Sequence, residues 1–240
     1  MRRDHRPHIL KRLDQGFQHW YVYHFLRPQL DYLGEGCTFM KPWYVEIFGG
    51  PVSIGAYTHV IATPDRRVRL TVWSTLEGAG QIEIGKYCLL CPGVRISAGS
   101  EIVIGESVMM AQGAFITDSD WHGVYDRSLS VGESIPVRID RNAWIGDSAI
   151  VAKGVTIGEN SIIGAGAVVV RDIPANVIAV GNPAAVVREL DPDRPMKTRR
   201  DWLADPVALA AQFAEIDRDR MKNNTWLGWL SALLRPAKGD

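Results

Sequence analysis

An apolar residue recurs at every sixth position through much of the C-terminal half of the chain. The anchors of this period are Ile139, Ile145, Val151, Ile157, Ile163 and Val169. A helix would need apolar spacings of three and four, and a simple half-buried strand would need a spacing of two. The period of six instead predicts a parallel β-solenoid, in which each repeat is a short strand followed by a turn.

Two further positions of each repeat fit this prediction. The fourth residue after each anchor is mostly small and is expected to point inward: Ala143, Ala149, Val155, Ser161 and Ala167. The third residue after each anchor is of a type that tolerates a left-handed backbone. Those residues are Asn142, Ser148, Gly154, Asn160 and Gly166. Many of the 23 glycines in the 240 residues therefore mark the turns and anchors of a repeat, not flexibility.

The same register continues upstream with interruptions. The anchors Ile84, Leu90 and Ile96 precede Ile104, Met110 and Ile116 by 20 residues, and these precede Ile139, Ile145 and Val151 by 35. Ile54 and Val60 precede Ile84 and Leu90 by 30. A coil of three six-residue repeats is shorter than these offsets. The extra residues predict loops near residues 62–78 and 118–136. Loops held on a rigid scaffold commonly carry function.

The segments that flank the repeat have a different pattern. We expect residues 1–44 to form an N-terminal helical cap, 45–190 the solenoid, and 191–240 a C-terminal helical extension. Asp205 and Pro206 are typical of the N-cap and first turn of a helix over 206–221. The apolar segment Thr225–Leu234 is expected to pack on coils of this chain or of a neighbouring subunit. The alternative for it is a weak peripheral contact with a membrane.

Composition excludes several classes of protein. The 27 Lys and Arg balance the 27 Asp and Glu, so the chain lacks the overall positive field that nucleic-acid binding uses. The longest apolar run, 162–170, is far shorter than the roughly 20 residues of a membrane span, and no signal-peptide pattern opens the sequence. We expect a cytoplasmic protein, with peripheral contact at the inner membrane face as a further option. Cys88 and Cys91 fall on repeat positions, and the three cysteines indicate neither a disulfide framework nor a four-cysteine zinc site.

Roughly residues 45–190, and most specifically the stretch from Asn142 to Arg188, resemble the hexapeptide-repeat, left-handed β-helix acyltransferases. The segments that carry the likeness are NAWIG at 142–146, KGVTIG at 153–158, GAGAVVVRDIP at 164–174 and VGNPAAVVR at 180–188. The closer likeness is to bacterial acetyltransferases that act on sugars, envelope polysaccharides or small xenobiotics. It implies an all-β, left-handed parallel β-helix with N- and C-terminal helical extensions. It also implies a homotrimer with its sites between subunits.

The resemblance implies an enzyme that transfers an acyl group directly from coenzyme A. Acetyl transfer to a hydroxyl of a sugar or surface-polysaccharide precursor is the leading expectation, with acetyl-CoA as co-substrate and no permanently bound cofactor or metal. The alternatives are N-acetylation of an amino sugar or small amine, and a non-catalytic β-helix scaffold. A γ-class carbonic anhydrase would need three coil histidines, whereas only His59 and His122 lie in the coil region.

The family places its catalytic histidine in an extruded loop, and His122 occupies that place in the 118–136 insert. Histidine suits a general base because an unperturbed pKa of about 6.5 leaves it mostly neutral yet basic at physiological pH. Asp118 and Asp120 are candidates for orienting its ring or, with Trp121, for binding the acceptor. Acceptor contacts are also expected from the 62–78 loop and from the neighbouring subunit.

For the coenzyme, the family lays the pantetheine arm in a groove between adjacent subunits. The matching positions here are Trp144, Asp147, Ala165, Arg171 and Arg188. The small side chain of Ala165 would leave the backbone open to the amides of the arm. Arg171 and Arg188 are suited to the nucleotide phosphates, because guanidinium groups bind phosphate in a two-pronged geometry.

Overall fold

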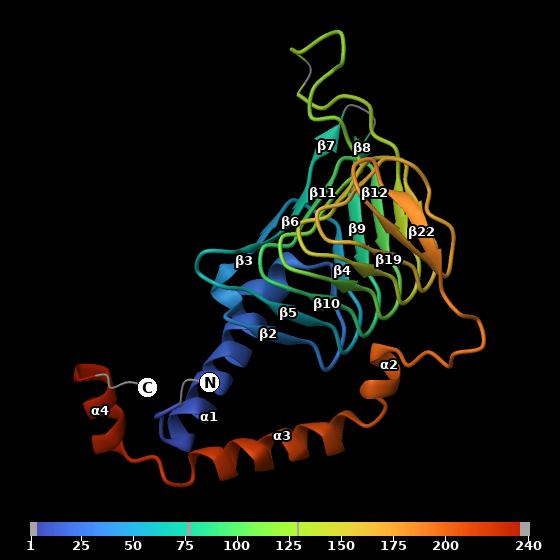
Figure 1. Ribbon diagram of the computed structural model, residues 1–240. Coiled ribbons are helices and arrows are strands. Elements are labelled where there is room, and N and C mark those ends of the chain that lie inside the picture. The colour runs from blue at the N-terminus through green and yellow to red at the C-terminus, as the bar shows by residue number, and fades with distance from the viewer. Residues whose placement is uncertain (1–3, 76–77, 129, 236–240) are drawn as a thin grey trace. The chain divides into compact units, whose positions relative to one another are not determined.

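The computed structural model describes residues 4–75, 78–128 and 130–235 (Figure 1). The chain forms two compact units. One is Tyr21–Trp202, and in the other Met1–Trp20 joins Leu203–Asp240. The larger unit contains all the strands of the described residues, so it holds the repeat that the sequence predicts.

The larger unit is built from successive coils, each of which places one strand in each of three parallel sheets (Figure 1). Sheet A contains β1 (Tyr32–Leu33), β4 (Val52–Ile54), β9 (Gln81–Ile84), β12 (Glu101–Ile104), β15 (Val137–Ile139) and β18 (Thr156–Ile157). Sheet B contains β2 (Thr38–Met40), β5 (His59–Ile61), β10 (Leu89–Leu90), β13 (Met109–Met110), β16 (Trp144–Ile145), β19 (Ile162–Ile163), β21 (Val177–Val180) and the antiparallel β22 (Ala185–Glu189). Sheet C contains β3 (Val45–Phe48), β6 (Val68–Val72), β11 (Arg95–Ala98), β14 (Phe115–Thr117), β17 (Ile150–Val151) and β20 (Val168–Val169).

The anchor spacings of the sequence become the register of these sheets. Ile84 lies opposite Ile104, and Ile104 lies opposite Ile139, as the offsets of 20 and 35 predict. The six anchors from Ile139 to Val169 are all 0% exposed, which confirms that they point inward. Each fully buried Ile or Val stabilises the fold by roughly 1.5–3 kcal/mol, so the column of anchors is the core of the solenoid.

The predicted turn residues do adopt the left-handed backbone. The φ angles are +57° at Asn142, +55° at Ser148, +73° at Gly154, +62° at Asn160 and +68° at Gly166. Asparagine adds a contact that glycine cannot make. The Asn142 Nδ2 donates to Asn160 Oδ1 at 2.9 Å, and Asn160 Nδ2 donates to Asn176 Oδ1 at 2.8 Å. The turns of three successive coils are therefore joined by side-chain hydrogen bonds.

Two details of the coils differ from the pattern seen in the sequence. The first coil begins at β1, inside the segment that we expected to be a helical cap. Its residues Leu33 and Phe39 are six apart, but Ile47 follows Phe39 by eight residues, so the period is too short to be recognised there. The extra residues near 62–78 form two separate features. One is a loop that precedes β6, and the other is the hairpin of β7 (Ser74–Thr75) and β8 (Gly78–Ala79).

Helices occupy the two ends of the chain. They are α1 (His8–Tyr21), the short turns Val22–Leu26, Arg27–Gln29 and Pro42–Tyr44, α2 (Arg199–Trp202), α3 (Pro206–Met221) and α4 (Trp226–Leu234). The predicted cap of α3 is confirmed, because the Asp205 carboxylate accepts from the Ala208 amide at 2.9 Å. In the smaller unit Lys11 pairs with Asp217 at 2.7 Å. None of the helices described here combines the length and the apolar character that crossing a bilayer requires.

Candidate active site

The insert that carries His122 leaves the solenoid at the turn from sheet C to sheet A, here called the C–A corner. Asp118 follows β14 directly and is 0% exposed. Its carboxylate accepts from the amides of Gly99 at 2.7 Å and Ser100 at 2.8 Å, and from the Ser119 hydroxyl at 2.6 Å. Gly99 and Ser100 belong to the same corner of the preceding coil. Asp118 therefore fixes the start of the insert to the coil before it.

The outgoing and returning ends of the insert are bonded to each other and to Lys153 of the next coil. Backbone hydrogen bonds join Asp120 N to Glu133 O at 2.9 Å and Gly132 N to Asp120 O at 2.7 Å. Lys153, at the next turn of the C–A corner, donates to Asp120 Oδ2 at 2.5 Å and to Glu133 Oε2 at 2.6 Å. The bond to Asp120, followed by the one to Glu133, raises the pKa of Lys153. Sequence reasoning missed Lys153, since its charge alone at a turn does not reveal partners so far away along the chain.

His122 itself is exposed, just beyond this fixed base. A Cβ on Gly132 would lie 2.5 Å from the His122 carbonyl oxygen, so the two backbones approach as closely as only glycine allows. On the other side, Trp121 packs edge-on against Trp73 with ring centroids 6.0 Å apart, and Trp73 packs on Phe48 at 5.2 Å. The chain around His122 is thus held by hydrogen bonds, a close backbone contact and an aromatic cluster.

The residues matched to coenzyme binding lie on two different corners. Trp144 is on the outward face of β16 and is 45% exposed. Asp147 and Ala165 occupy successive turns from sheet B to sheet C, here called the B–C corner, and the Gly166 amide donates to Asp147 O at 2.7 Å. Arg188 lies on β22, which extends sheet B. These four residues therefore share sheet B and its downstream edge.

Arg171 does not join them. It follows β20, so it lies on the C–A corner with the insert of His122. Within one chain, sheet C separates the His122 insert from the B–C corner that carries Asp147 and Ala165. The two groups of candidate residues therefore lie at opposite edges of sheet C within one chain.

The other coil histidine has a structural environment. His59 on β5 is contacted by Arg199 of α2, with Nη2 of Arg199 3.1 Å from Nδ1, and the Trp202 ring packs edge-on at 5.8 Å. Burial, followed by the charge of Arg199, lowers the pKa of His59 to about 4. The ring is therefore neutral at physiological pH. Across the described ranges, no three side chains of the His, Cys, Asp and Glu types form a cluster that could hold a metal ion.

The cysteines follow the repeat. Cys88 is 0% exposed, and its Sγ donates to the Gly105 carbonyl at 3.1 Å. Burial raises the pKa of the Cys88 thiol to about 12 and that of Cys37 to about 11. These thiols are protonated at neutral pH, and the inward position predicted for Cys88 is confirmed.

Comparisons with known proteins agree with this architecture. Residues 136–171 match the family model described as bacterial transferase hexapeptide (six repeats). Galactoside O-acetyltransferase of Escherichia coli (strain K12) is 41% identical over 112 residues, which cover 46% of this chain and 55% of that protein. The chain thus spans about half or less of the length of the curated relatives it matches.

Solved structures share the fold at low sequence identity. A variant of AntD, an N-acyltransferase from Bacillus cereus in complex with dTDP-4-amino-4,6-dideoxyglucose and coenzyme A, superimposes with a TM-score of 0.59 and 18% identity. The match covers 80% of this chain and 95% of that one. A hexapeptide-repeat acetyltransferase from Vibrio cholerae, complexed with acetyl coenzyme A, has a TM-score of 0.50 and 22% identity, covering 74% and 81%. Residues 136–171 are thus similar to the bacterial transferase hexapeptide repeat, and the larger unit shares its fold with hexapeptide-repeat acyltransferases of known structure.

Proposed function

We propose that the chain is an acyl-CoA-dependent acyltransferase that transfers an acetyl group to a hydroxyl of a sugar or surface-polysaccharide precursor. The observation that carries the proposal is the exposed His122 on an insert whose base is fixed by Asp118, Lys153 and Trp121. A base must be held in place to act, and positioning of this kind supports general-base catalysis. The named acetyltransferase among its relatives supports the reaction class.

In the proposed mechanism His122 takes the proton of the acceptor hydroxyl as the oxygen attacks the thioester carbonyl. The tetrahedral intermediate then collapses, and the carbon–sulfur bond breaks. The leaving thiolate takes the proton from the imidazolium, so the products are the acetyl ester and free coenzyme A. No acyl-enzyme forms on this route.

We further propose a left-handed coil and a homotrimer with each site between two subunits. One copy would contribute Trp144, Asp147, Ala165 and Arg188, and its neighbour would contribute His122 and Arg171. The separation of these groups by sheet C in a single chain supports this arrangement. Asp118 and Asp120, whose side chains bind the backbone and Lys153, would act by positioning the insert. A cytoplasmic location completes the proposal, and for Thr225–Leu234 a weak peripheral membrane contact is the alternative to packing on coils.

A thiol-release screen with acetyl-CoA tests this function against sugars, nucleotide sugars and amines. Release with hydroxyl acceptors is expected, whereas release with amines alone would establish N-acylation instead. The His122→Ala variant should lose about two to four orders of magnitude in turnover while it still binds acetyl-CoA, since that is the typical contribution of a general base. Absence of thiol release with every acceptor would favour a scaffold.

A further inference from the structure

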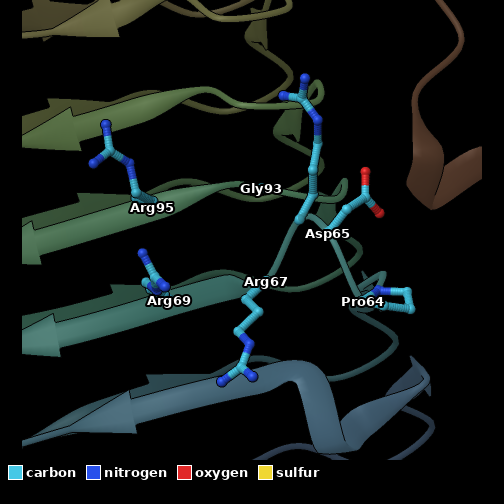
Figure 2. Close-up of a pocket in the computed structure, with 7 residues that line it drawn as sticks. Pro64, Asp65, Arg67, Arg69, Gly93 and Arg95 are labelled. Carbon is cyan, nitrogen blue, oxygen red and sulfur yellow. The ribbon is translucent and has the colours of Figure 1, made fainter.

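A pocket of about 560 Å³ lies at the loop that precedes β6, and its lining includes none of the residues matched to catalysis or to coenzyme binding. Four arginines line it: Arg66, Arg67, Arg69 and Arg95 (Figure 2). Its volume is within the range of small-molecule sites, but charged groups line it where apolar side chains are the norm. A pocket of this composition is suited to an anion.

The carboxylates near the pocket do not neutralise it. Glu46 on β3 binds Arg69 Nε at 2.6 Å through one oxygen and Arg67 through the other, and these bonds lower the pKa of Glu46. In Figure 2 the Arg67 side chain points toward β3. In the parts of the chain that the structure describes, no carboxylate pairs with Arg66 or Arg95. Four guanidinium groups therefore face two carboxylates, Glu46 and the lining residue Asp65.

Arg69 and Arg95 are direct register partners on the neighbouring strands β6 and β11 (Figure 2). Like charges directly opposite each other in a sheet are destabilising. The Arg95 guanidinium lies 4.2 Å from the Phe115 ring centroid, so it stacks on an aromatic face without losing its charge. An anion bound between the arginines would replace this repulsion with charge-assisted hydrogen bonds.

Arg66 extends from the pocket to the B–C corner, which carries the candidate coenzyme-binding residues Asp147 and Ala165. Its Cβ and Cδ lie 3.5 Å from the point that a Cβ on Gly93 would occupy, and its Nη1 lies 3.4 Å from the corresponding point on Gly113. The Ser148 hydroxyl is 3.2 Å from that second point. Arg66 thus runs along the B–C corner and ends beside the turn that contains Asp147.

We propose that this pocket binds a phosphate or diphosphate group of the acyl acceptor, as in a phosphorylated or nucleotide-linked sugar. The inference rests on the proposed function. The His122 insert leaves between the fourth and fifth coils, and Asp147 and Ala165 lie on the fifth and sixth. Acyl-CoA bound along the fifth and sixth coils would leave the second and third coils free for the acceptor. The pocket lies on those two coils.

The binding test uses inorganic pyrophosphate and titration calorimetry on the full chain. We expect binding to the wild type and a loss of at least tenfold in affinity in the Arg66→Ala/Arg95→Ala double variant. Arg138→Ala, which removes an exposed arginine on β15, is the matched control and should bind normally. Equal binding by all three proteins would overturn the proposal. Because all three substitutions are at exposed positions, matching circular dichroism spectra should show that the variants fold.

Two further experiments distinguish a phosphate of the acceptor from a phosphate of coenzyme A. Saturation with coenzyme A should leave pyrophosphate binding intact, and its abolition would assign the pocket to the donor and overturn the acceptor proposal. In kinetics, the double variant should raise KM at least tenfold for a nucleoside diphosphate sugar and leave a neutral sugar unaffected. An equal effect on both acceptors would contradict it. Pyrophosphate binding without any acyl transfer would refute the proposed function while retaining the anion site.

Discussion

Lys153 and Asp120 form an ion pair at 2.5 Å between one coil turn and the insert that leaves the preceding coil. The same ammonium also reaches Glu133, so one cation joins the outgoing and returning ends of the His122 insert. Because this contact lies at the base of the insert and not at its tip, it would position the proposed base His122 without touching the reacting atoms.

Replacing Lys153 should therefore affect catalysis more than stability. We expect Lys153→Met to lower kcat about tenfold, because the base is less well positioned. Its melting temperature should change little, since a partly exposed ion pair contributes about 0–1 kcal/mol. Lys86→Met, at a turn of another coil, is the control. An unchanged kcat in Lys153→Met would show that the pair does not position His122.

Asp118 should instead matter for stability. The Asp118→Ala variant leaves the buried amide of Gly99 and the partly buried amide of Ser100 without their acceptor. Each such loss costs about 1–3 kcal/mol, so we expect the free energy of unfolding to fall by about 2–4 kcal/mol in urea titrations. Asp118→Asn keeps one acceptor oxygen and should lie between Ala and the wild type. Wild-type stability in Asp118→Ala would contradict this role.

His59 predicts a specific dependence of stability on pH. Its pKa is about 4 in the folded chain, against about 6.5 when unfolded, so the unfolded chain binds the proton first as pH falls. The stability that His59 contributes is present above about pH 6.5 and is lost as the pH falls towards 4. Melting temperatures across this range should fall less steeply for His59→Gln than for the wild type. Parallel curves for the two proteins would refute the assignment.

The cysteines should differ in reactivity. Burial raises the pKa of all three thiols, and Cys88 is the most completely buried. Since the thiolate is the reactive form, an aromatic disulfide reagent should label Cys88 only after unfolding. Mass spectrometry of the labelled native chain reads this directly. Rapid native labelling of Cys88 would show that the coil opens there.

The repeat could be predicted from sequence because its rule is local. Ile139, Ile145 and Val151 each repeat the same choice six residues apart, and the left-handed turn at Asn142 needs only its own residue type. The first coil was missed because only Leu33 and Phe39 are six residues apart, and Ile47 follows Phe39 by eight.

The candidate site was less predictable because its contacts join distant parts of the chain. Lys153 meets Asp120 through stacking of coils across an insert, and Arg69 meets Arg95 in a register set by the length of another insert. His122 could be proposed because a histidine in a long insert is visible in the sequence and the resembling family places its catalytic histidine there. The partners of the insert became visible only in the fold.

The central claim is that the two halves of each site come from different copies of the chain. The most direct measurement mixes two inactive variants, His122→Ala and Ala165→Trp, by co-expression and isolates the mixed oligomers through separate tags. Each mixed cyclic trimer should contain one intact pair of halves among its three interfaces, so about a third of the wild-type activity should return. Mixed oligomers as inactive as the parent variants would place both halves of the site in a single chain and contradict the claim.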